Sequence, residues 1–104
     1  MCGIFGVIDH PSIDRDRFKN ALALLHHRGP DSTDAKFWER AAFGFTRLAI
    51  LDLSPNGNQP MTLLDNSLTI VFNGEIYNYE ILREKLKSEG AQFFSRSDTE
   101  VILH

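Results

Sequence analysis

The chain has 104 residues, with 11 Lys or Arg against 14 Asp or Glu, so its formal charge is −3 at pH 7. A composition of 42% apolar and 24% charged residues is typical of one soluble globular domain. The acidic balance argues against a nucleic-acid partner. No apolar run approaches the ~18 residues that cross a membrane, and the N-terminus lacks the basic leader of a signal peptide. We therefore expect a cytoplasmic protein that binds neither nucleic acid nor membrane.

The first half of the chain predicts three strands and one helix. Residues 2–8 are apolar and β-rich, which is typical of a short buried strand. Residues 35–51 predict two strands around Glu39-Arg40, the second covering 42–51. The intervening helix ends at Gly29-Pro30 and presents one apolar face, formed by Phe18, Ala21, Leu22 and Leu25.

The second half predicts a loop over 53–60, a strand over 68–72 and two helices. Asn78 can cap the first helix, which presents Tyr79, Leu82 and Leu86 and ends before Gly90. Ser97 to Glu100 has the Ser-x-x-Glu form of a capping box, and a single apolar turn follows it. Because helix nucleation is costly and only propagation offsets it, we expect the chain to stop inside a larger domain.

Cys2 is the first candidate for chemistry. Removal of Met1 is expected before a small second residue, and it would make Cys2 the N-terminus. The α-amino group, with a pKa near ~7.7–8.0, could then serve as the base for the thiol of the same residue. The alternative is a free cysteine packed as a small hydrophobe in the first strand.

The dipeptide Asn73-Gly74 also has two interpretations. The Asn side-chain amide and the Gly backbone N–H could together stabilise a developing oxyanion. Asn-Gly after an apolar stretch is equally a strong signal for a hairpin turn.

Three charged residues could bind an amino acid. Arg47 interrupts an apolar strand, where its guanidinium could bind a carboxylate or simply face outward. Glu75 and Asp98 could receive an ammonium group, or serve as a solvated turn residue and a helix cap. No metal site is expected, because the four His and one Cys show no ligand spacing.

Taken together, short motifs spanning the chain resemble class II glutamine amidotransferase domains, and most closely the glutaminase domain of glutamine-hydrolysing asparagine synthetases. The motifs occur in the family's order. They are Met-Cys-Gly-Ile-Phe-Gly at 1–6, His-Arg-Gly-Pro-Asp at 27–31, Arg-Leu-Ala-Ile at 47–50, Gln-Pro-Met at 59–61, Phe-Asn-Gly-Glu-Ile-Tyr-Asn at 72–78 and Ser-Asp-Thr-Glu at 97–100.

The resemblance implies an α+β fold, the four-layer αββα sandwich of N-terminal nucleophile hydrolases, built from antiparallel sheets between helical layers. It implies that Cys2 attacks the side-chain amide of glutamine while Asn73 and Gly74 hold the oxyanion. Hydrolysis of a γ-glutamyl thioester then releases glutamate. The substrate-binding residues it implies are Arg47 for the α-carboxylate, Leu48, Ala49, Ile50 and Leu51 along the pocket wall, and Glu75 and Asp98 for the α-ammonium.

The same resemblance implies that residues 1–104 are the N-terminal part of a type 2 glutamine amidotransferase domain. A synthetase domain would follow and use ATP and magnesium to amidate aspartate, whereas no cofactor is expected in these residues. The implied partners are L-glutamine, that synthetase domain and a second copy in a homodimer. Two alternatives stay open: a glutaminase portion whose acceptor is an amino sugar, a phosphoribosyl compound or a polysaccharide precursor, or an inactive half-domain fragment.

Overall fold

A computed structural model describes all residues, 1–104, and shows an α+β chain with two antiparallel sheets. Strands β1, β3 and β2 form the first sheet in that order, and β4 pairs with β5 in the second. The elements are β1 (Gly3–Ile8), α1 (Arg15–Ala23), η1 (His26–Arg28), β2 (Ser32–Phe37), β3 (Ala41–Arg47), η2 (Pro55–Gly57), β4 (Met61–Thr62), β5 (Thr69–Ile70), α2 (Tyr79–Ser88) and α3 (Thr99–Leu103).

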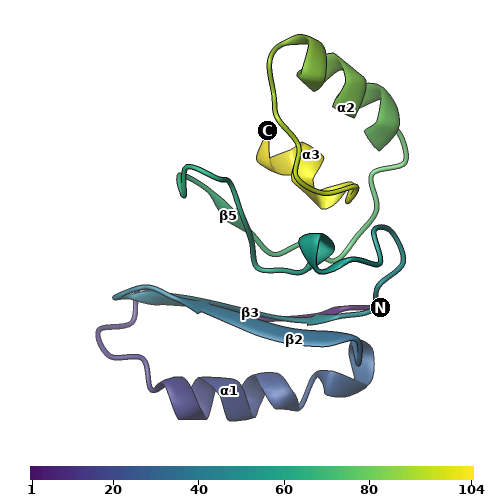
Figure 1. Ribbon diagram of the computed structural model, residues 1–104. Coiled ribbons are helices and arrows are strands. Elements are labelled where there is room, and N and C mark those ends of the chain that lie inside the picture. Colours follow the sequence, from purple (N-terminus) through teal and green to yellow (C-terminus); the bar gives the residue numbers. More distant parts are fainter.

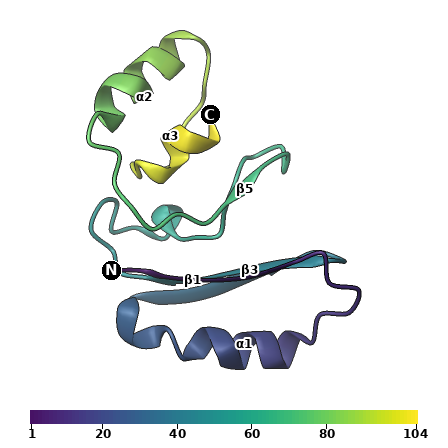
Figure 2. The same ribbon diagram turned by 180° about the vertical axis from the view of Figure 1, so that it is seen from behind.

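The elements lie in layers on the two sides of the three-stranded sheet. Helix α1 covers one face of this sheet, and the β4–β5 hairpin lies on the opposite side together with α3 and α2 (Figure 1). The view from behind shows the same order of layers (Figure 2). The α+β class, with antiparallel sheets and helices, is therefore confirmed. The complete four-layer sandwich stays a prediction.

The core lies between α1 and the first sheet. Asp14 caps α1, since its side chain accepts a hydrogen bond from the Arg17 N–H at 3.1 Å. Phe18 and Leu22 are buried against Ala42 of β3, which confirms the predicted apolar face of the helix. Gly44 permits this close packing, because a Cβ there would lie 2.7 Å from a Leu22 methyl.

The strand predicted over 42–51 is shorter than expected, since β3 ends at Arg47. The chain turns away because its pairing partners change at this point. Asp31 N–H donates to the Arg47 carbonyl at 2.9 Å, and the Asp31 carboxylate accepts from Ala49 N–H at 2.7 Å. After Arg47, the Asp31 side chain takes the place of a strand backbone as the hydrogen-bond partner, and residues 48–51 form a loop rather than a strand.

The second sheet also differs from the prediction. The strand expected over 68–72 contains only Thr69 and Ile70, and it pairs with β4, a two-residue strand that the sequence pattern does not predict. On the side of Pro60, the ladder between β4 and β5 ends at the Met61–Ile70 pair.

Helix α2 begins and ends where predicted, but its capping differs. Asn78 occupies the N-cap without a side-chain hydrogen bond. Gly90 follows the helix with φ of 102°, the left-handed conformation that favours glycine at this position.

The capping box predicted at Ser97 to Glu100 is wrong. Ser97 N–H donates to the Ser95 hydroxyl at 3.2 Å rather than to Glu100. The Glu100 carboxylate is instead fully buried and reaches further back, to the backbone N–H groups of Phe94 at 2.8 Å and Ser95 at 2.7 Å.

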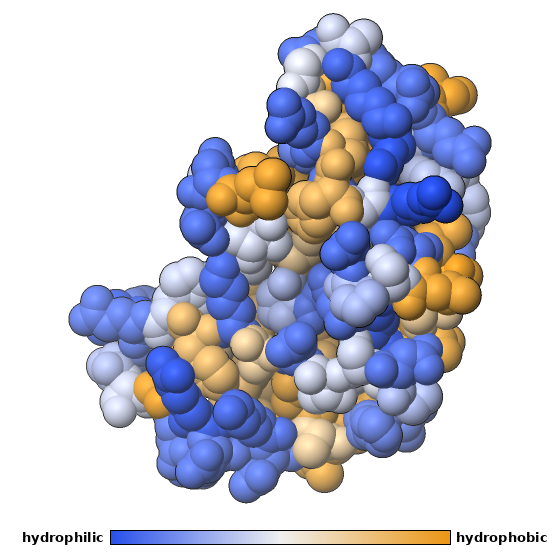
Figure 3. All heavy atoms as spheres, viewed as in Figure 1, coloured by the Kyte–Doolittle hydropathy of each residue, from blue (hydrophilic) through white to orange (hydrophobic).

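Several large apolar side chains remain at the surface. Figure 3 shows them as separate orange areas among hydrophilic ones on the face that it presents. No helix of the structure is both long and apolar enough to cross a membrane. The exposed apolar residues include Ile8, Leu24, Leu53, Leu64, Tyr77 and Ile81.

Candidate functional site

One cavity of about 360 Å³ lies where four separate segments of the chain meet. The N-terminus of β1 forms one wall, and the loop after β3 forms the second. The segment after β5 and the start of α3 form the rest. The lining residues are Met1, Cys2, Phe45, Arg47, Leu48, Ile50, Leu51, Gly57, Gln59, Phe72, Asn73, Gly74, Glu75, Tyr77, Ser97, Asp98 and Thr99.

Every residue predicted for the site except Ala49 lines this cavity. Ala49 instead uses its backbone N–H to bind the Asp31 carboxylate and fix the loop after β3. Of the residues predicted for the pocket wall, Ala49 alone is absent from the cavity lining, and β3 ends two residues before it. Leu48, Ile50 and Leu51 do reach the cavity.

Cys2 is half-buried directly before β1 and faces the loop after β3. Its Sγ accepts a hydrogen bond from Leu48 N–H at 3.3 Å and lies 3.7 Å from the Leu48 carbonyl oxygen. The Arg28 guanidinium donates through Nε to the Cys2 carbonyl at 2.9 Å. Leu48 thus holds the side chain of Cys2, and Arg28 holds its backbone. Cys2 lines the cavity.

Arg47 is buried, with 6% of its surface exposed, so it does not face outward as one alternative proposed. Nη1 donates to the Ser54 carbonyl at 2.9 Å and to Asn58 Oδ1 at 2.8 Å. Nη2 donates to the carbonyls of Leu51 and Asp52. The guanidinium therefore organises the loop after β3 as well as lining the cavity.

The loop closes tightly around this guanidinium. A Cβ at Gly57 would collide with Arg47 Nη2 and lie 2.9 Å from the Asp52 carbonyl oxygen. Glycine at this position is what lets the backbone approach the charged group so closely.

Asp98 and Glu75 are the acidic residues of the cavity. Asp98 is 6% exposed and occupies the N-cap of α3 without capping it; its Oδ2 accepts from Ile76 N–H at 2.9 Å instead. Glu75 is exposed beside it. The ion pairs of the structure involve neither carboxylate, so both charges lack a basic partner within 4.0 Å.

Asn73 and Gly74 do not form the hairpin turn that was their alternative interpretation. The partner of β5 is the preceding β4, and the chain continues from Gly74 towards α2. Neighbours on both sides are fixed, since Phe72 is hydrogen-bonded to the Gln59 side chain and Ile76 to Asp98. Asn73 and Gly74 are therefore held at the cavity wall from both directions.

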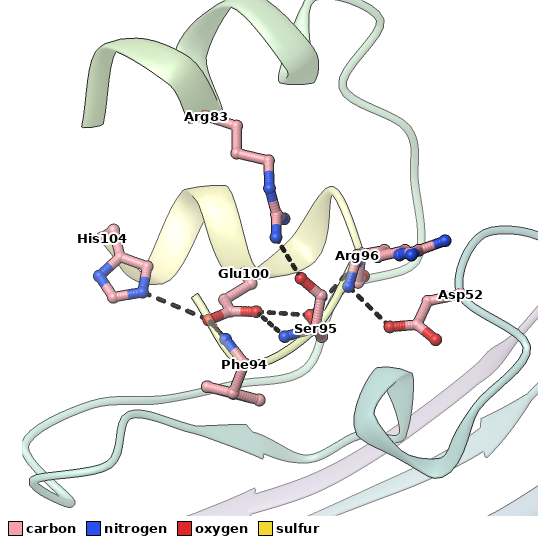
Figure 4. A network of polar contacts seen from close by, with 8 residues as sticks. Asp52, Arg83, Phe94, Ser95, Arg96, Glu100 and His104 are labelled. Carbon is pink, nitrogen blue, oxygen red and sulfur yellow. Dashed lines mark hydrogen bonds and ion pairs between the residues drawn. The ribbon is translucent and has the colours of Figure 1, made fainter. Parts of the chain in front are cut away.

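A buried carboxylate anchors the helix that carries Asp98. Figure 4 shows Glu100 bound to the Ser95 hydroxyl at 2.5 Å as well as to two backbone N–H groups. Arg83 of α2 donates to the Ser95 carbonyl, and its guanidinium lies 4.2 Å from the centre of the Phe93 ring. These contacts hold the segment before α3 against α2 and so fix the start of α3 at the cavity.

Asp52 joins the loop after β3 to the segment before α3. Burial raises the pKa of Asp52, but hydrogen bonds from Arg96 N–H and from the hydroxyl and N–H of Ser54, with the positive charge of Arg47, hold that pKa below its ordinary value of 3.8. The contact from Arg96 N–H is 2.6 Å long (Figure 4).

Sequence reasoning missed several lining residues, among them Gln59 and Thr99, whose side chains are hydrogen-bonded within the site. Gln59 belongs to the Gln-Pro-Met motif and Thr99 to the Ser-Asp-Thr-Glu motif, but neither motif carried a role for them. The two side chains are hydrogen-bonded to each other at 3.2 Å. In the whole chain, no group of three or more His, Cys, Asp or Glu is arranged to hold a metal ion.

Comparison with known proteins identifies the family. A family model described as a glutamine amidotransferase domain matches residues 1–104. The chain is 45% identical to asparagine synthetase [glutamine-hydrolyzing] 1 of Bacillus subtilis, over 99% of this chain and 17% of that protein. It is 44% identical to asparagine synthetase [glutamine-hydrolyzing] 2 of Arabidopsis thaliana, over 100% and 18%. It is 37% identical to amidase chyE of Penicillium rubens, over 99% and 17%.

The chain thus spans less than a fifth of the length of these relatives. The family model covers the entire chain, including the segments that meet at the cavity. The chain belongs to the class II glutamine amidotransferase family.

Proposed function

We propose that this chain hydrolyses the side-chain amide of glutamine with Cys2 as the nucleophile. The observation that carries the proposal is the cavity itself, because Cys2, Asn73-Gly74 and an unpaired carboxylate border one space from three distant parts of the chain. A nucleophile, two oxyanion donors and a charged binding group are the components that acyl transfer from an amino acid requires.

The chemical steps follow from these groups. Removal of Met1 frees the α-amino group of Cys2, which takes the thiol proton as Sγ bonds to the amide carbon. The Asn73 amide and the Gly74 N–H stabilise the resulting oxyanion. The C–N bond then breaks, the proton passes from the α-amine to the leaving group, and ammonia departs. Water attacks the γ-glutamyl thioester, which releases glutamate and restores the thiol.

Recognition of glutamine as a zwitterion would use the charged residues of the cavity. Asp98, buried and without a basic partner, would hold the α-ammonium together with Glu75. Arg47 would bind the α-carboxylate. Because four of its five N–H groups already donate to the loop after β3, a carboxylate bound through two hydrogen bonds would have to replace at least one of those loop acceptors.

We further propose that residues 1–104 are the N-terminal part of a four-layer N-terminal nucleophile hydrolase domain in a longer cytoplasmic, homodimeric enzyme. A synthetase domain of that enzyme would use ATP and magnesium to amidate aspartate with the released ammonia. The printed names of the relatives and the small share of their length that this chain spans support this extension. The residues described here would bind only glutamine.

The test of the glutaminase proposal is glutamate release from glutamine by the full-length protein. We expect activity in the unaltered protein and none in Cys2→Ala, because Cys2 supplies the only thiol that lines the cavity. Cys2→Ser retains an oxygen nucleophile and serves as the conservative comparison. Unchanged hydrolysis in Cys2→Ala, or a mature protein that is active while retaining Met1, would contradict the mechanism.

The acceptor of the ammonia is tested separately. The full-length protein, supplied with glutamine, aspartate, ATP and magnesium, should form asparagine. The similarity to an amidase favours a second candidate, in which the same glutaminase chemistry supplies a different acceptor. Glutamate release without asparagine formation would support that candidate.

A further inference from the structure

The β4–β5 ladder is interrupted directly before the segment that contains Asn73. Met61 pairs with Ile70 and Thr62 with Thr69. Continued in the same register, Pro60 would lie opposite Val71 and Gln59 opposite Phe72. The ladder ends at Met61, so Phe72 has no strand partner across from it.

The side chain of Gln59 supplies the missing pairing. Gln59 Oε1 accepts from Phe72 N–H at 2.6 Å, and Gln59 Nε2 donates to the Phe72 carbonyl at 3.1 Å. The primary amide thus satisfies both backbone groups of Phe72, as the backbone of a neighbouring strand would. Phe72 directly precedes Asn73, so this pair of hydrogen bonds fixes the peptide that leads into Asn73.

The second hydrogen of the Gln59 amide reaches a different wall of the cavity. Nε2 also donates to Thr99 Oγ1 at 3.2 Å, in the first turn of α3 and next to Asp98. Gln59 is 6% exposed, and both its donors and its acceptor are used. One buried side chain therefore links the segment of Asn73 to the helix of Asp98.

We propose that Gln59 is a positioning residue that sets the Asn73-Gly74 oxyanion donors relative to Cys2. This inference rests on the proposed glutaminase function. Gln59 would not bind glutamine through the contacts described, because its amide is already committed to Phe72 and Thr99. Its effect would be strongest when charge develops on the substrate oxygen, since the oxyanion donors act mainly in the transition state.

The experiment compares Gln59→Leu and Gln59→Glu with the unaltered full-length protein. Gln59→Leu removes all three hydrogen bonds. Gln59→Glu keeps the shape and the acceptor for Phe72 N–H but places an oxygen against the Phe72 carbonyl. We expect kcat for glutamate release to fall on the order of 10- to 100-fold in both, with little change in KM, since a misplacement of ~1 Å can cost ~10²-fold.

A matched control lies in the same hairpin. Thr62 forms side-chain hydrogen bonds with Lys36 at 2.9 Å and with Thr69 at 2.9 Å, and it does not line the cavity. Thr62→Val removes these bonds without touching Phe72, so it should leave kcat within about 2-fold while perturbing the hairpin to a similar extent. Thermal unfolding of all three variants verifies that they are folded at the assay temperature.

The reactivity of the thiol distinguishes positioning from general damage. The rate of Cys2 alkylation by iodoacetamide should stay within about 2-fold of the unaltered protein in Gln59→Glu, because the contacts of Cys2 to Leu48 are unchanged. An unchanged kcat in folded Gln59→Glu, or a kcat loss matched by Thr62→Val, would overturn the inference. Absence of hydrolysis in the unaltered protein with an intact Cys2 would instead refute the proposed function.

Discussion

At the residue scale, the charges of the cavity differ in how they are paired. Arg47 is held by four hydrogen bonds from its terminal nitrogens to the loop after β3. The Asp98 carboxylate accepts one hydrogen bond, from Ile76 N–H, and has no basic partner. The Asp98 carboxylate can therefore accept further hydrogen bonds from an ammonium group. The Arg47 guanidinium, by contrast, already stabilises the loop after β3.

Asp98→Asn tests this difference. The amide keeps an oxygen for Ile76 N–H but loses the negative charge, so the loop should stay in place while ammonium binding weakens. We expect KM for glutamine to rise on the order of 10- to 100-fold with kcat little changed, because a hydrogen bond to a charged group contributes about 1.5–3 kcal/mol. Steady-state kinetics with a thermal melt checks this, and an unchanged KM would contradict the role given to Asp98.

At the element scale, helix α1 packs on the sheet through its two buried side chains, Phe18 and Leu22. Leu22 is 2% exposed and packs in the core, whereas Leu24, the C-cap residue of the same helix, is 77% exposed. Leu22→Ala should lower the free energy of unfolding by about 2–5 kcal/mol, because it leaves a cavity under the sheet. Leu24→Ala is the matched control and should change it by less than about 0.5 kcal/mol. Chemical denaturation measures both, and equal effects would contradict the packing described.

The loop after β3 is expected to respond to acid through Asp52. The pKa of Asp52 lies below 3.8 in the folded chain, so the stability that this carboxylate contributes is present above that value. It is lost as the pH falls through the lowered pKa of the folded state. Asp52→Asn should therefore melt earlier than the unaltered chain at pH 7, and the difference should shrink at pH values below about 3.8. A difference independent of pH would show that the charge contributes nothing.

Local sequence patterns predicted elements whose stabilising contacts are local. The face of α1, the apolar β1 and the glycine after α2 all follow from side-chain periodicity or backbone freedom, which are visible in a few consecutive residues. The end of β3 could not be predicted in this way. It depends on Asp31, which binds Ala49 from 18 positions away in the sequence.

The contacts within the candidate site were equally beyond prediction from local sequence patterns. Short motifs identified many of the residues around the cavity, because five of the six motifs contribute lining residues; the motif at 27–31 contributes none. The same motifs could not show that the Arg47 guanidinium holds a loop, or that Gln59 spans 13 positions to Phe72 and 40 to Thr99. Contacts of this kind exist only once the layers have been assembled.

At the scale of the whole molecule, the cavity forms where the first sheet meets the layer that contains the β4–β5 hairpin, α3 and α2 (Figure 1). Cys2 directly precedes β1 of the first sheet, while Asn73 and Asp98 belong to the second layer. The proposed chemistry therefore requires both layers to keep their relative position. Asp52 helps to maintain it, since it joins the loop after β3 to Arg96 N–H.

The most direct measurement is mass spectrometry of the full-length protein after rapid acid quenching during glutamine turnover. The account predicts that Met1 is absent and that a glutamyl group is attached to the peptide that carries Cys2, and that Cys2→Ala carries no such adduct. Turnover with Met1 still in place, or with a glutamyl group found on a residue other than Cys2, would contradict the account.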